Sequence, residues 1–163
     1  MKISFVVAVA KNGVMGSHNA LPFYIPDDLK HFKQITVGHT VLMGKNTFDS
    51  IMKRLGHPLP DRRNVVITHQ KDYQAPEGVL VFHDLYEALT ALSKDTQELM
   101  VAGGGQIYKQ LVEMGKVNKI YMTHVHKEVD GDVMFPEIDW GQWIKINEEV
   151  HEDFTWTDYE RID

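Results

Sequence analysis

The sequence contains no cysteine, and this absence excludes several kinds of chemistry. Without thiols the chain has no disulfide, no thiolate nucleophile and no cysteine-based zinc site, and it fits a reducing cytoplasm. A basic excess is also missing, because 17 Lys and Arg stand against 23 Asp and Glu for a net charge of −6. Specific nucleic-acid binding is therefore not expected, since proteins of that kind usually carry a basic surplus.

Long hydrophobic runs are absent too: nowhere does the chain offer the ~18 apolar residues that would indicate a membrane helix. The N-terminal run ISFVVAVA ends in a motif that imitates a signal-peptidase site. The apolar region before that motif is shorter than the ~7–15 residues that a signal requires, so we predict a buried strand instead. No repeat or linker divides the chain, so we predict a single domain over residues 1–163. No obligate protein partner is expected.

Short apolar runs rich in β-branched residues alternate with helical patterns, as is typical of strands covered on both faces. The runs lie at residues 3–9, 40–44, 64–68, 79–82, 98–103 and 119–125, and the helical patterns at residues 27–35, 47–55, 85–92 and 106–115. Alternating apolar residues at Ile144, Ile146, Val150, Phe154 and Trp156 predict a terminal antiparallel hairpin. We therefore predict an α/β fold with a mostly parallel central sheet of about eight strands and helices on both faces.

Two glycine-containing turns join a predicted strand to a predicted helix, at residues 43–48 and 101–111. Helix N-termini present N–H groups to phosphates, and glycine allows close approach to the backbone. Two such turns favour a long ligand with more than one phosphate. The alternative is that both are simple tight turns, with Thr47 as an N-cap and Lys45 as a solvated charge. Tyr108 occupies the position of the third glycine in the usual dinucleotide fingerprint, so a conventional Rossmann domain is not expected.

Two adjacent acids begin the helix predicted at residues 27–35. Asp28 falls at the edge of the apolar stripe that contains Leu29 and Phe32, whereas Asp27 falls on the more polar side. A carboxylate beside apolar side chains pays a desolvation cost unless it has a partner, and such groups are often functional. The alternative is an ordinary first-turn acid that interacts with the helix dipole.

Two further pairs of residues have both a functional and a plain interpretation. Arg62 and Arg63 precede a strand, and an arginine fork suits a carboxylate, although such pairs are usually surface charge. His124 and His126 alternate along one predicted strand and could begin a metal site. Two surface histidines are the plainer interpretation, and we predict no metal.

Taken together, these segments resemble dihydrofolate reductase over the whole length of the chain and in order. The matching blocks are KNGVMGSHNALPF (11–23), LPFYIPDDLKHFK (21–33), MGKNTFDSI (43–51), PLPDRRNVVIT (58–68), VAGGGQIY (101–108), YMTHV (121–125) and EVDGDVMFP (128–136). The resemblance implies an oxidoreductase that uses NADPH to reduce 7,8-dihydrofolate to 5,6,7,8-tetrahydrofolate, with hydride transfer to pterin C6 and protonation of N5. It also implies a cytoplasmic monomer that supplies one-carbon metabolism and binds antifolate inhibitors.

The resemblance also implies a role for individual residues. Asp28 matches the acid that binds the pterin, and the other substrate positions are Ala8, Leu21, Phe32, Ile51, Leu59, Arg62 and Thr123. Arg62 matches the arginine that clamps the glutamate carboxylate of the substrate. The cofactor positions are Ala8, Lys45, Asn46, Thr47, Thr68, His69, Ala102, Gly103, Gly104, Gly105, Gln106, Ile107 and Tyr108. Lys45, Asn46 and His69 are expected near the 2′-phosphate, and a cis peptide bond is expected between Gly103 and Gly104.

The chain departs from the family pattern in three places. Phe23 stands where bacterial relatives commonly have tryptophan, so a water bridge from an indole at that position to the acid is excluded. Lys45 stands where arginine is frequent, and residues 52–57 form a longer segment than is usual. Three alternatives stay open: a pyrimidine reductase of riboflavin synthesis on the same sheet, a non-catalytic nucleotide-binding module, and a metal hydrolase built on His124 and His126.

Overall fold

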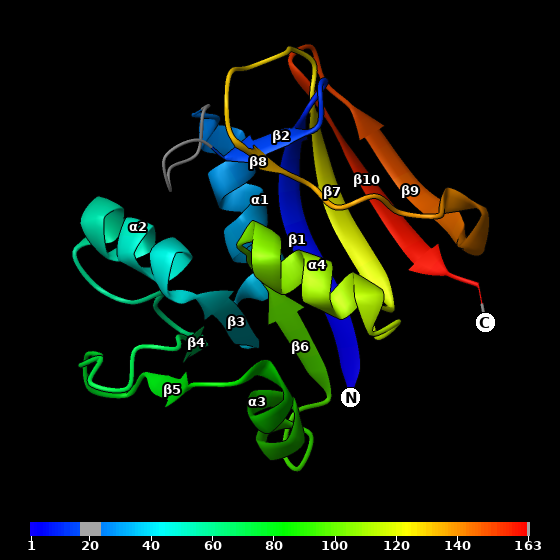
Figure 1. Cartoon of the computed structure of the whole chain (residues 1–163). Helices are drawn as coiled ribbons and strands as arrows, with labels where there is room; N and C mark the ends of the chain where they lie inside the picture. Colours follow the sequence, from blue (N-terminus) through cyan, green and yellow to red (C-terminus); the bar gives the residue numbers. More distant parts are fainter. Residues whose placement is uncertain (17–23, 163) are drawn as a thin grey trace.

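The computed structural model describes residues 1–16 and 24–162, and its main element is an eight-stranded sheet (Figure 1). The sheet comprises β1 (Lys2–Ala10), β3 (Thr40–Gly44), β4 (Arg63–Ile67), β5 (Leu80–Phe82), β6 (Glu98–Val101), β7 (Lys119–Val125), β9 (Trp143–Val150) and β10 (Phe154–Arg161). Their spatial order is β5-β4-β3-β6-β1-β7-β10-β9. All pairs are parallel except β7–β10 and β10–β9, which are antiparallel. The predicted mostly parallel sheet with a closing hairpin is confirmed.

Four α-helices cover the two faces of the sheet (Figure 1). They are α1 (Pro26–Thr36), α2 (Lys45–Leu55), α3 (Leu85–Leu92) and α4 (Gly105–Glu113). Helices α3 and α4 contribute to one core cluster, and α1 and α2 to the other. Neighbouring strand residues alternate between the two clusters, because successive side chains of a strand point to opposite faces. Val65 lies in the first cluster and Val66 in the second.

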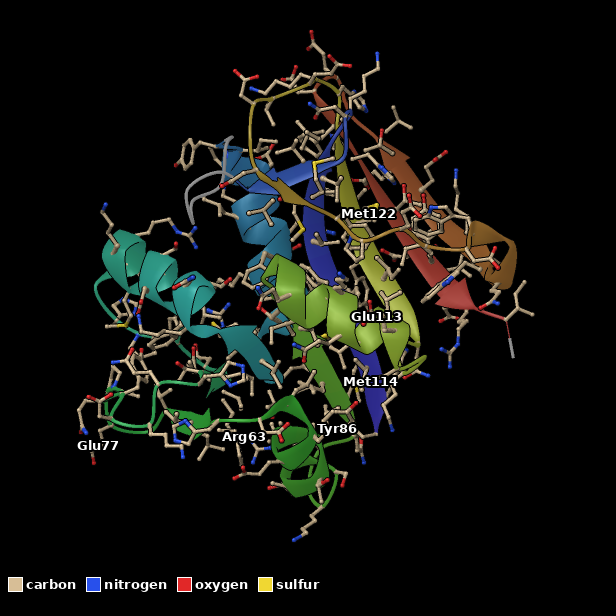
Figure 2. The ribbon with its side chains drawn as sticks, in the orientation of Figure 1. Arg63, Glu77, Tyr86, Glu113, Met114 and Met122 are labelled. Carbon is tan, nitrogen blue, oxygen red and sulfur yellow. The ribbon has the colours of Figure 1, made fainter. Side chains whose placement is uncertain are left out.

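The smaller elements complete the architecture. A two-stranded ribbon pairs β2 (Val14–Gly16) with β8 (Val133–Met134), and the 3₁₀ helix η1 (Trp140–Gln142) precedes β9. Side chains cover both faces of the sheet (Figure 2). Met122 of β7 and Tyr86 of α3 are labelled there as points of reference. Of the helices in the part of the chain that the structure describes, none has the length and apolarity to cross a membrane.

Boundaries of helices and strands follow local chemistry, and several differ by one or two residues from the prediction. Asp84 caps α3 as predicted, because its side chain accepts a hydrogen bond from the Tyr86 N–H at 2.8 Å. Helix α2 begins at Lys45 with Gly44 as its N-cap, so the interpretation of Thr47 as the N-cap is wrong. Strand β6 ends at Val101, earlier than predicted, because the chain turns at Gly103 with φ +122°.

The terminal hairpin is formed as predicted, but its apolar residues are buried unequally. Phe154 is buried on β10, which lies between β7 and β9. Ile144 and Ile146 on β9 remain 49% and 37% exposed. Strand β9 is the edge of the sheet, so its side chains have a neighbouring strand on one side only. Alternation therefore identified the strand correctly without implying that its apolar face is buried.

Candidate active site

A cavity of about 840 Å³ opens where the carboxyl ends of β1, β3 and β6 meet the N-termini of α2 and α4. The carboxyl end of a parallel sheet is where ligands bind in α/β folds. Its walls have two parts of different character. One part is formed by the two glycine turns, and the other by apolar side chains of β1, α1 and α2 around a single acid of α1.

The glycine turns lie against one another in the first part. The N–H of Gly44 donates to the carbonyl oxygen of Gly103 at 2.9 Å, and the predicted cis bond between Gly103 and Gly104 is present. Gly103 has φ +122°, a conformation that L side chains rarely adopt. A Cβ at Gly104 would lie 3.3 Å from Oγ1 of Thr47. The backbone of both turns is therefore shaped for close approach by a ligand.

The start of each helix fits a phosphate group. The N-cap residues of α2 and α4 are Gly44 and Gly104, which have no side chain to cap the helix, and both helices begin at the wall of the cavity. Uncapped first-turn N–H groups and the positive end of the helix dipole together favour anions. The residues present thus suit a dinucleotide whose phosphates lie between the two helices.

The structure brings all the predicted cofactor positions to this cavity. Those in its lining are Ala8, Lys45, Asn46, Thr47, Thr68, His69, Ala102, Gly103, Gly104, Gly105, Gln106, Ile107 and Tyr108. Tyr108 is buried, and its hydroxyl donates to the carbonyl oxygen of Val6 at 2.8 Å. Burial raises the pKa of Tyr108, which keeps this hydroxyl protonated. The hydrogen bond from Tyr108 to Val6 therefore connects α4 to β1.

Lys45 at the start of α2 has an acidic partner on its own helix. Its Nζ lies 2.7 Å from Oδ2 of Asp49 and 5.6 Å from the ring centroid of Tyr73. The hydrogen bond to Asp49 raises the pKa of Lys45 and keeps it charged. A phosphate that binds at this end of the cavity would meet a cation already engaged by a carboxylate.

The acid of the second part is Asp28, and its neighbour Asp27 points elsewhere. Asp27 is exposed, whereas Asp28 is half-buried and lines the cavity with Leu29 and Phe32. The predicted division of the two acids between the faces of α1 is confirmed. Two hydrogen-bond donors offset the cost of partly burying the Asp28 carboxylate. The Thr123 hydroxyl donates to Oδ1 of Asp28 at 2.6 Å, and the Trp156 indole N–H donates to the same oxygen at 3.0 Å.

His31 lies one turn after Asp28 and also lines the cavity. Its ring stacks on Trp156 with centroids 3.9 Å apart and planes 10° apart. Burial lowers the pKa of His31, and this effect outweighs the opposing influence of Asp28. The imidazole is therefore neutral at pH 7 and acts as a flat packing surface.

Not every predicted substrate residue reaches the cavity. Ala8, Asp28, Phe32, Ile51 and Thr123 line it, whereas Leu59 and Arg62 do not. Leu59 is 4% exposed and belongs to the core cluster against which Phe32 packs.

Among the described residues, Arg62 donates two hydrogen bonds. Its Nε donates to the carbonyl oxygen of Pro60 at 2.7 Å and Nη1 to the Thr36 hydroxyl at 3.1 Å. Partial burial lowers the pKa of Arg62, which remains charged. Leu21 and Phe23 lie outside the described residues.

The two histidines of β7 are engaged in the sheet. Nε2 of His124 lies 3.0 Å from the Tyr159 hydroxyl. Nδ1 of His126 contacts the carbonyl oxygen of Glu152 at 2.9 Å, and Nε2 contacts the Thr155 hydroxyl at 2.7 Å. Among residues 1–16 and 24–162 no group of three or more His, Asp or Glu is arranged to hold a metal ion. The hydrolase alternative therefore has no geometric support.

Trp156 is one of the residues at the site that the sequence did not identify. The alternating pattern placed it on the inner face of the hairpin, but its partner lies 128 residues away on α1. His31 and Tyr121 line the cavity and were also missed. A signal for Tyr121 exists in the sequence, because it alternates with Thr123 on the same predicted strand.

One part of the cavity suits the phosphates of a dinucleotide and the other offers apolar side chains around the Asp28 carboxylate, the arrangement expected of a dinucleotide-dependent reductase. Known proteins identify the particular family. The family model described as dihydrofolate reductase matches residues 2–161. The chain belongs to the dihydrofolate reductase family.

Individual relatives agree with this assignment. The chain is 40% identical over 151 residues to dihydrofolate reductase type 3 of Salmonella typhimurium, covering 93% of this chain and 88% of that protein. It is 40% identical over 147 residues to the dihydrofolate reductase of Bacillus subtilis, covering 90% and 83%. The solved dihydrofolate reductase from Enterococcus faecalis, complexed with NADP(H) and RAB-propyl, superposes with a TM-score of 0.87 at 34% identity, covering 99% and 97%.

The predicted family, fold, enzyme class and NADPH cofactor are confirmed by these comparisons. The protein is an oxidoreductase that reduces dihydrofolate with NADPH. The pyrimidine reductase alternative is not favoured, since the relatives described above are dihydrofolate reductases.

Proposed function

We propose that this chain converts 7,8-dihydrofolate to 5,6,7,8-tetrahydrofolate in a single domain, with Asp28 as the residue that orients the pterin. The observation that carries this proposal is the fixed position of Asp28: it lies in the apolar part of the cavity and is held by Thr123 and Trp156. The uncapped starts of α2 and α4 belong to the same cavity. One cavity thus accommodates a hydride donor and its acceptor together.

The cofactor lies against the two glycine turns. First-turn N–H groups of α2 and α4 bind its phosphates, and Gly103 and Gly104 let the pyrophosphate approach the backbone. Lys45, Asn46 and His69 bind the 2′-phosphate, which distinguishes NADPH from NADH. NADPH, when bound, supplies the hydride.

The substrate lies in the apolar part of the cavity. Asp28 accepts hydrogen bonds from the pterin 2-amino group and N3, while Phe32 and Ile51 flank the rings. This arrangement aligns pterin C6 for hydride transfer, and alignment of two rings is the main task of the protein. The proton for N5 arrives through water, and Asp28 orients the ring that receives it. Arg62 lies outside the lining of the cavity, and we infer that it binds the glutamate carboxylate where the tail of the substrate leaves the cavity, because an arginine fork suits a carboxylate.

Three further predictions accompany this function. We infer that antifolate inhibitors bind in the same apolar part of the cavity, because they compete for the acid that orients the pterin. The single domain is supported by one continuous sheet with a core on each face. A cytoplasmic location stays a prediction from the sequence.

The decisive experiment follows absorbance at 340 nm with NADPH, with and without dihydrofolate. We expect a loss of absorbance that requires both compounds and that an antifolate abolishes. Replacing NADPH with NADH should give a slower reaction. Oxidation of NADPH only with a pyrimidine substrate of riboflavin synthesis would contradict the proposal, as would binding of NADPH with no turnover of dihydrofolate.

A further inference from the structure

Two neighbouring strands place a donor on the same oxygen of Asp28. Thr123 on β7 and Trp156 on β10 are register partners, so their side chains leave the same face of the sheet side by side. The Thr123 hydroxyl donates to Oδ1 at 2.6 Å, and the Trp156 indole N–H donates to Oδ1 at 3.0 Å. Both strands therefore hold the carboxylate of Asp28 through a single oxygen atom, Oδ1.

Three aromatic side chains hold the Trp156 indole in place. His31 stacks on it at 3.9 Å with planes 10° apart. His151 approaches at 4.8 Å with planes 66° apart, and Phe154 lies at 5.0 Å. An indole enclosed in this way loses little further freedom when its N–H hydrogen bonds, so the donor is pre-organised.

The pair of donors fixes the rotation of the carboxylate. The terminal torsion of an aspartate is broad, so an unheld carboxylate samples many orientations. Both donors of the described residues act on Oδ1, and no described side chain donates to Oδ2. Because Oδ1 is fixed, the orientation of Oδ2 is fixed too, and Oδ2 is the oxygen that would accept a hydrogen bond from a ligand. Hydrogen bonds to an ionised acceptor are shorter and stronger than neutral ones, which suits this purpose.

We propose that Trp156 is a positioning residue for catalysis, which holds Asp28 in the orientation that aligns the pterin with the hydride donor. The proposal rests on the proposed function, because it assumes that Asp28 binds the pterin. Trp156 acts through Asp28, and its ring need not touch either ligand; it is absent from the lining of the cavity. Its loss should therefore affect the dihydrofolate reaction and leave the cofactor half unchanged, since a small misplacement of a reacting ring slows a reaction considerably.

The test is Trp156→Phe, which keeps an aromatic ring beside His31 and removes the N–H donor together with one ring of the indole. We expect kcat/KM for dihydrofolate to fall about tenfold, the scale of one hydrogen bond to a charged group. We expect kcat to fall and KM to rise, because the orientation of Asp28 affects both binding of the pterin and hydride transfer. The dissociation constant of NADPH should change less than twofold. Trp156→Met, which fills space without a donor, provides the same comparison if Trp156→Phe folds poorly.

A matched control separates positioning from packing. His151→Phe keeps an aromatic contact with Trp156 and lies outside the cavity, so kcat/KM should stay near the wild-type value. In an Asp28→Ala background, where the acceptor is gone, Trp156→Phe should have no further effect on single-turnover hydride transfer. An undiminished effect in that background would overturn the proposal, and so would a wild-type kcat/KM in Trp156→Phe.

The same measurements keep the two proposals distinct. A wild-type protein that does not oxidise NADPH with dihydrofolate contradicts the proposed function itself. A wild-type protein that does so, combined with an unchanged Trp156→Phe variant, contradicts only the role of Trp156. Equal losses of NADPH affinity and of activity would show that Trp156 supports the fold of the whole cavity, and would also overturn a role through Asp28.

Discussion

Lys45 forms an ion pair with Asp49, one turn later on α2, with Nζ 2.7 Å from Oδ2. The side chains are 31% and 46% exposed, so water screens the pair. The same lysine is proposed to bind the 2′-phosphate of NADPH. If Lys45 binds that phosphate as proposed, the carboxylate of Asp49 competes with it, and we expect this competition to weaken the preference for NADPH.

Two variants test this competition. Lys45→Ala should weaken the binding of NADPH about tenfold, which is the scale of one charged hydrogen bond. The binding of NADH should be nearly unchanged. Asp49→Asn should strengthen NADPH relative to NADH, because the lysine loses its competing partner. Dissociation constants from titration of each cofactor check both results at low and high salt. An equal loss of binding affinity for NADH and NADPH in Lys45→Ala would show that this lysine does not bind the 2′-phosphate.

Arg62 offers a prediction about the substrate tail. Arg62→Lys keeps the charge and loses the planar fork, so KM for dihydrofolate should rise several-fold while NADPH binding stays near normal. Some loss of thermal stability is also expected, because Arg62 donates to Pro60 and Thr36. Measured with a substrate that lacks the glutamate, the variant and the wild type should have similar KM values.

Arg63→Lys is the matched control for this measurement. The neighbouring arginine makes its charged contacts to Asp95, away from the cavity, and should affect stability without changing KM. If the truncated substrate suffers equally from Arg62→Lys, the role of Arg62 as a carboxylate clamp is wrong.

Features that depend on neighbouring residues were predictable from the sequence. Apolar periodicity identified the strands and helices, and it separated Asp28 from Asp27, because the face of a helix follows from spacing alone. The glycine turns were also recognisable, since Gly103 and Gly44 stand between a strand and a helix. Local chemistry therefore located the part of the cavity that the two glycine turns form.

Features that depend on strand register were not predictable. Trp156 meets Asp28 only because β10 pairs with β7 in a register that places it beside Thr123. Nothing local in the sequence specifies that register, since both strands alternate in the same way. The exposure of Ile144 was not predictable for a similar reason. Ile144 is exposed because β9 lies at the edge of the sheet, and the order of the strands cannot be inferred from local sequence.

The ion pair between Arg63 and Asp95 predicts how stability depends on acid. Arg63 lies close to the end of α3 (Figure 2), and its Nη1 and Nη2 each lie 2.9 Å from an oxygen of Asp95. The hydrogen bonds from Arg63 lower the pKa of Asp95 from 3.8 to about 2. A carboxyl with a lowered folded-state pKa contributes stability above its unfolded pKa, and this contribution is lost as pH falls toward 2.

Asp95→Asn removes this dependence. Between about pH 4 and pH 2 the free energy of unfolding of the wild type should fall more steeply than that of the variant. The effect should be small and should shrink in high salt, because the pair is exposed. Urea unfolding across this pH range provides the measurement, and parallel curves for the two proteins would contradict the assignment.

Asp28 and Asp27 give the sharpest comparison in the chain, because adjacent residues of identical chemistry face different surroundings. Asp28→Asn retains an oxygen that can accept from Thr123 and Trp156, so the fold and NADPH binding should be preserved. It removes the charge that binds the pterin, and one amide hydrogen of the new side chain opposes the pterin donors. Activity at neutral pH should therefore fall by roughly 10²–10⁴, the scale of lost acid–base assistance.

Asp27→Asn is the control, since Asp27 is exposed and lies outside the lining of the cavity. Its activity should stay within about twofold of the wild type, with at most a small loss of helix stability from the weaker interaction with the dipole. Thermal melts and NADPH titrations of both variants establish that each is folded, and steady-state rates with dihydrofolate then separate them. If Asp27→Asn proved the damaging change and Asp28→Asn the silent one, the orientation of α1 toward the cavity would be wrong, and with it the role of Thr123 and Trp156 in holding the acid.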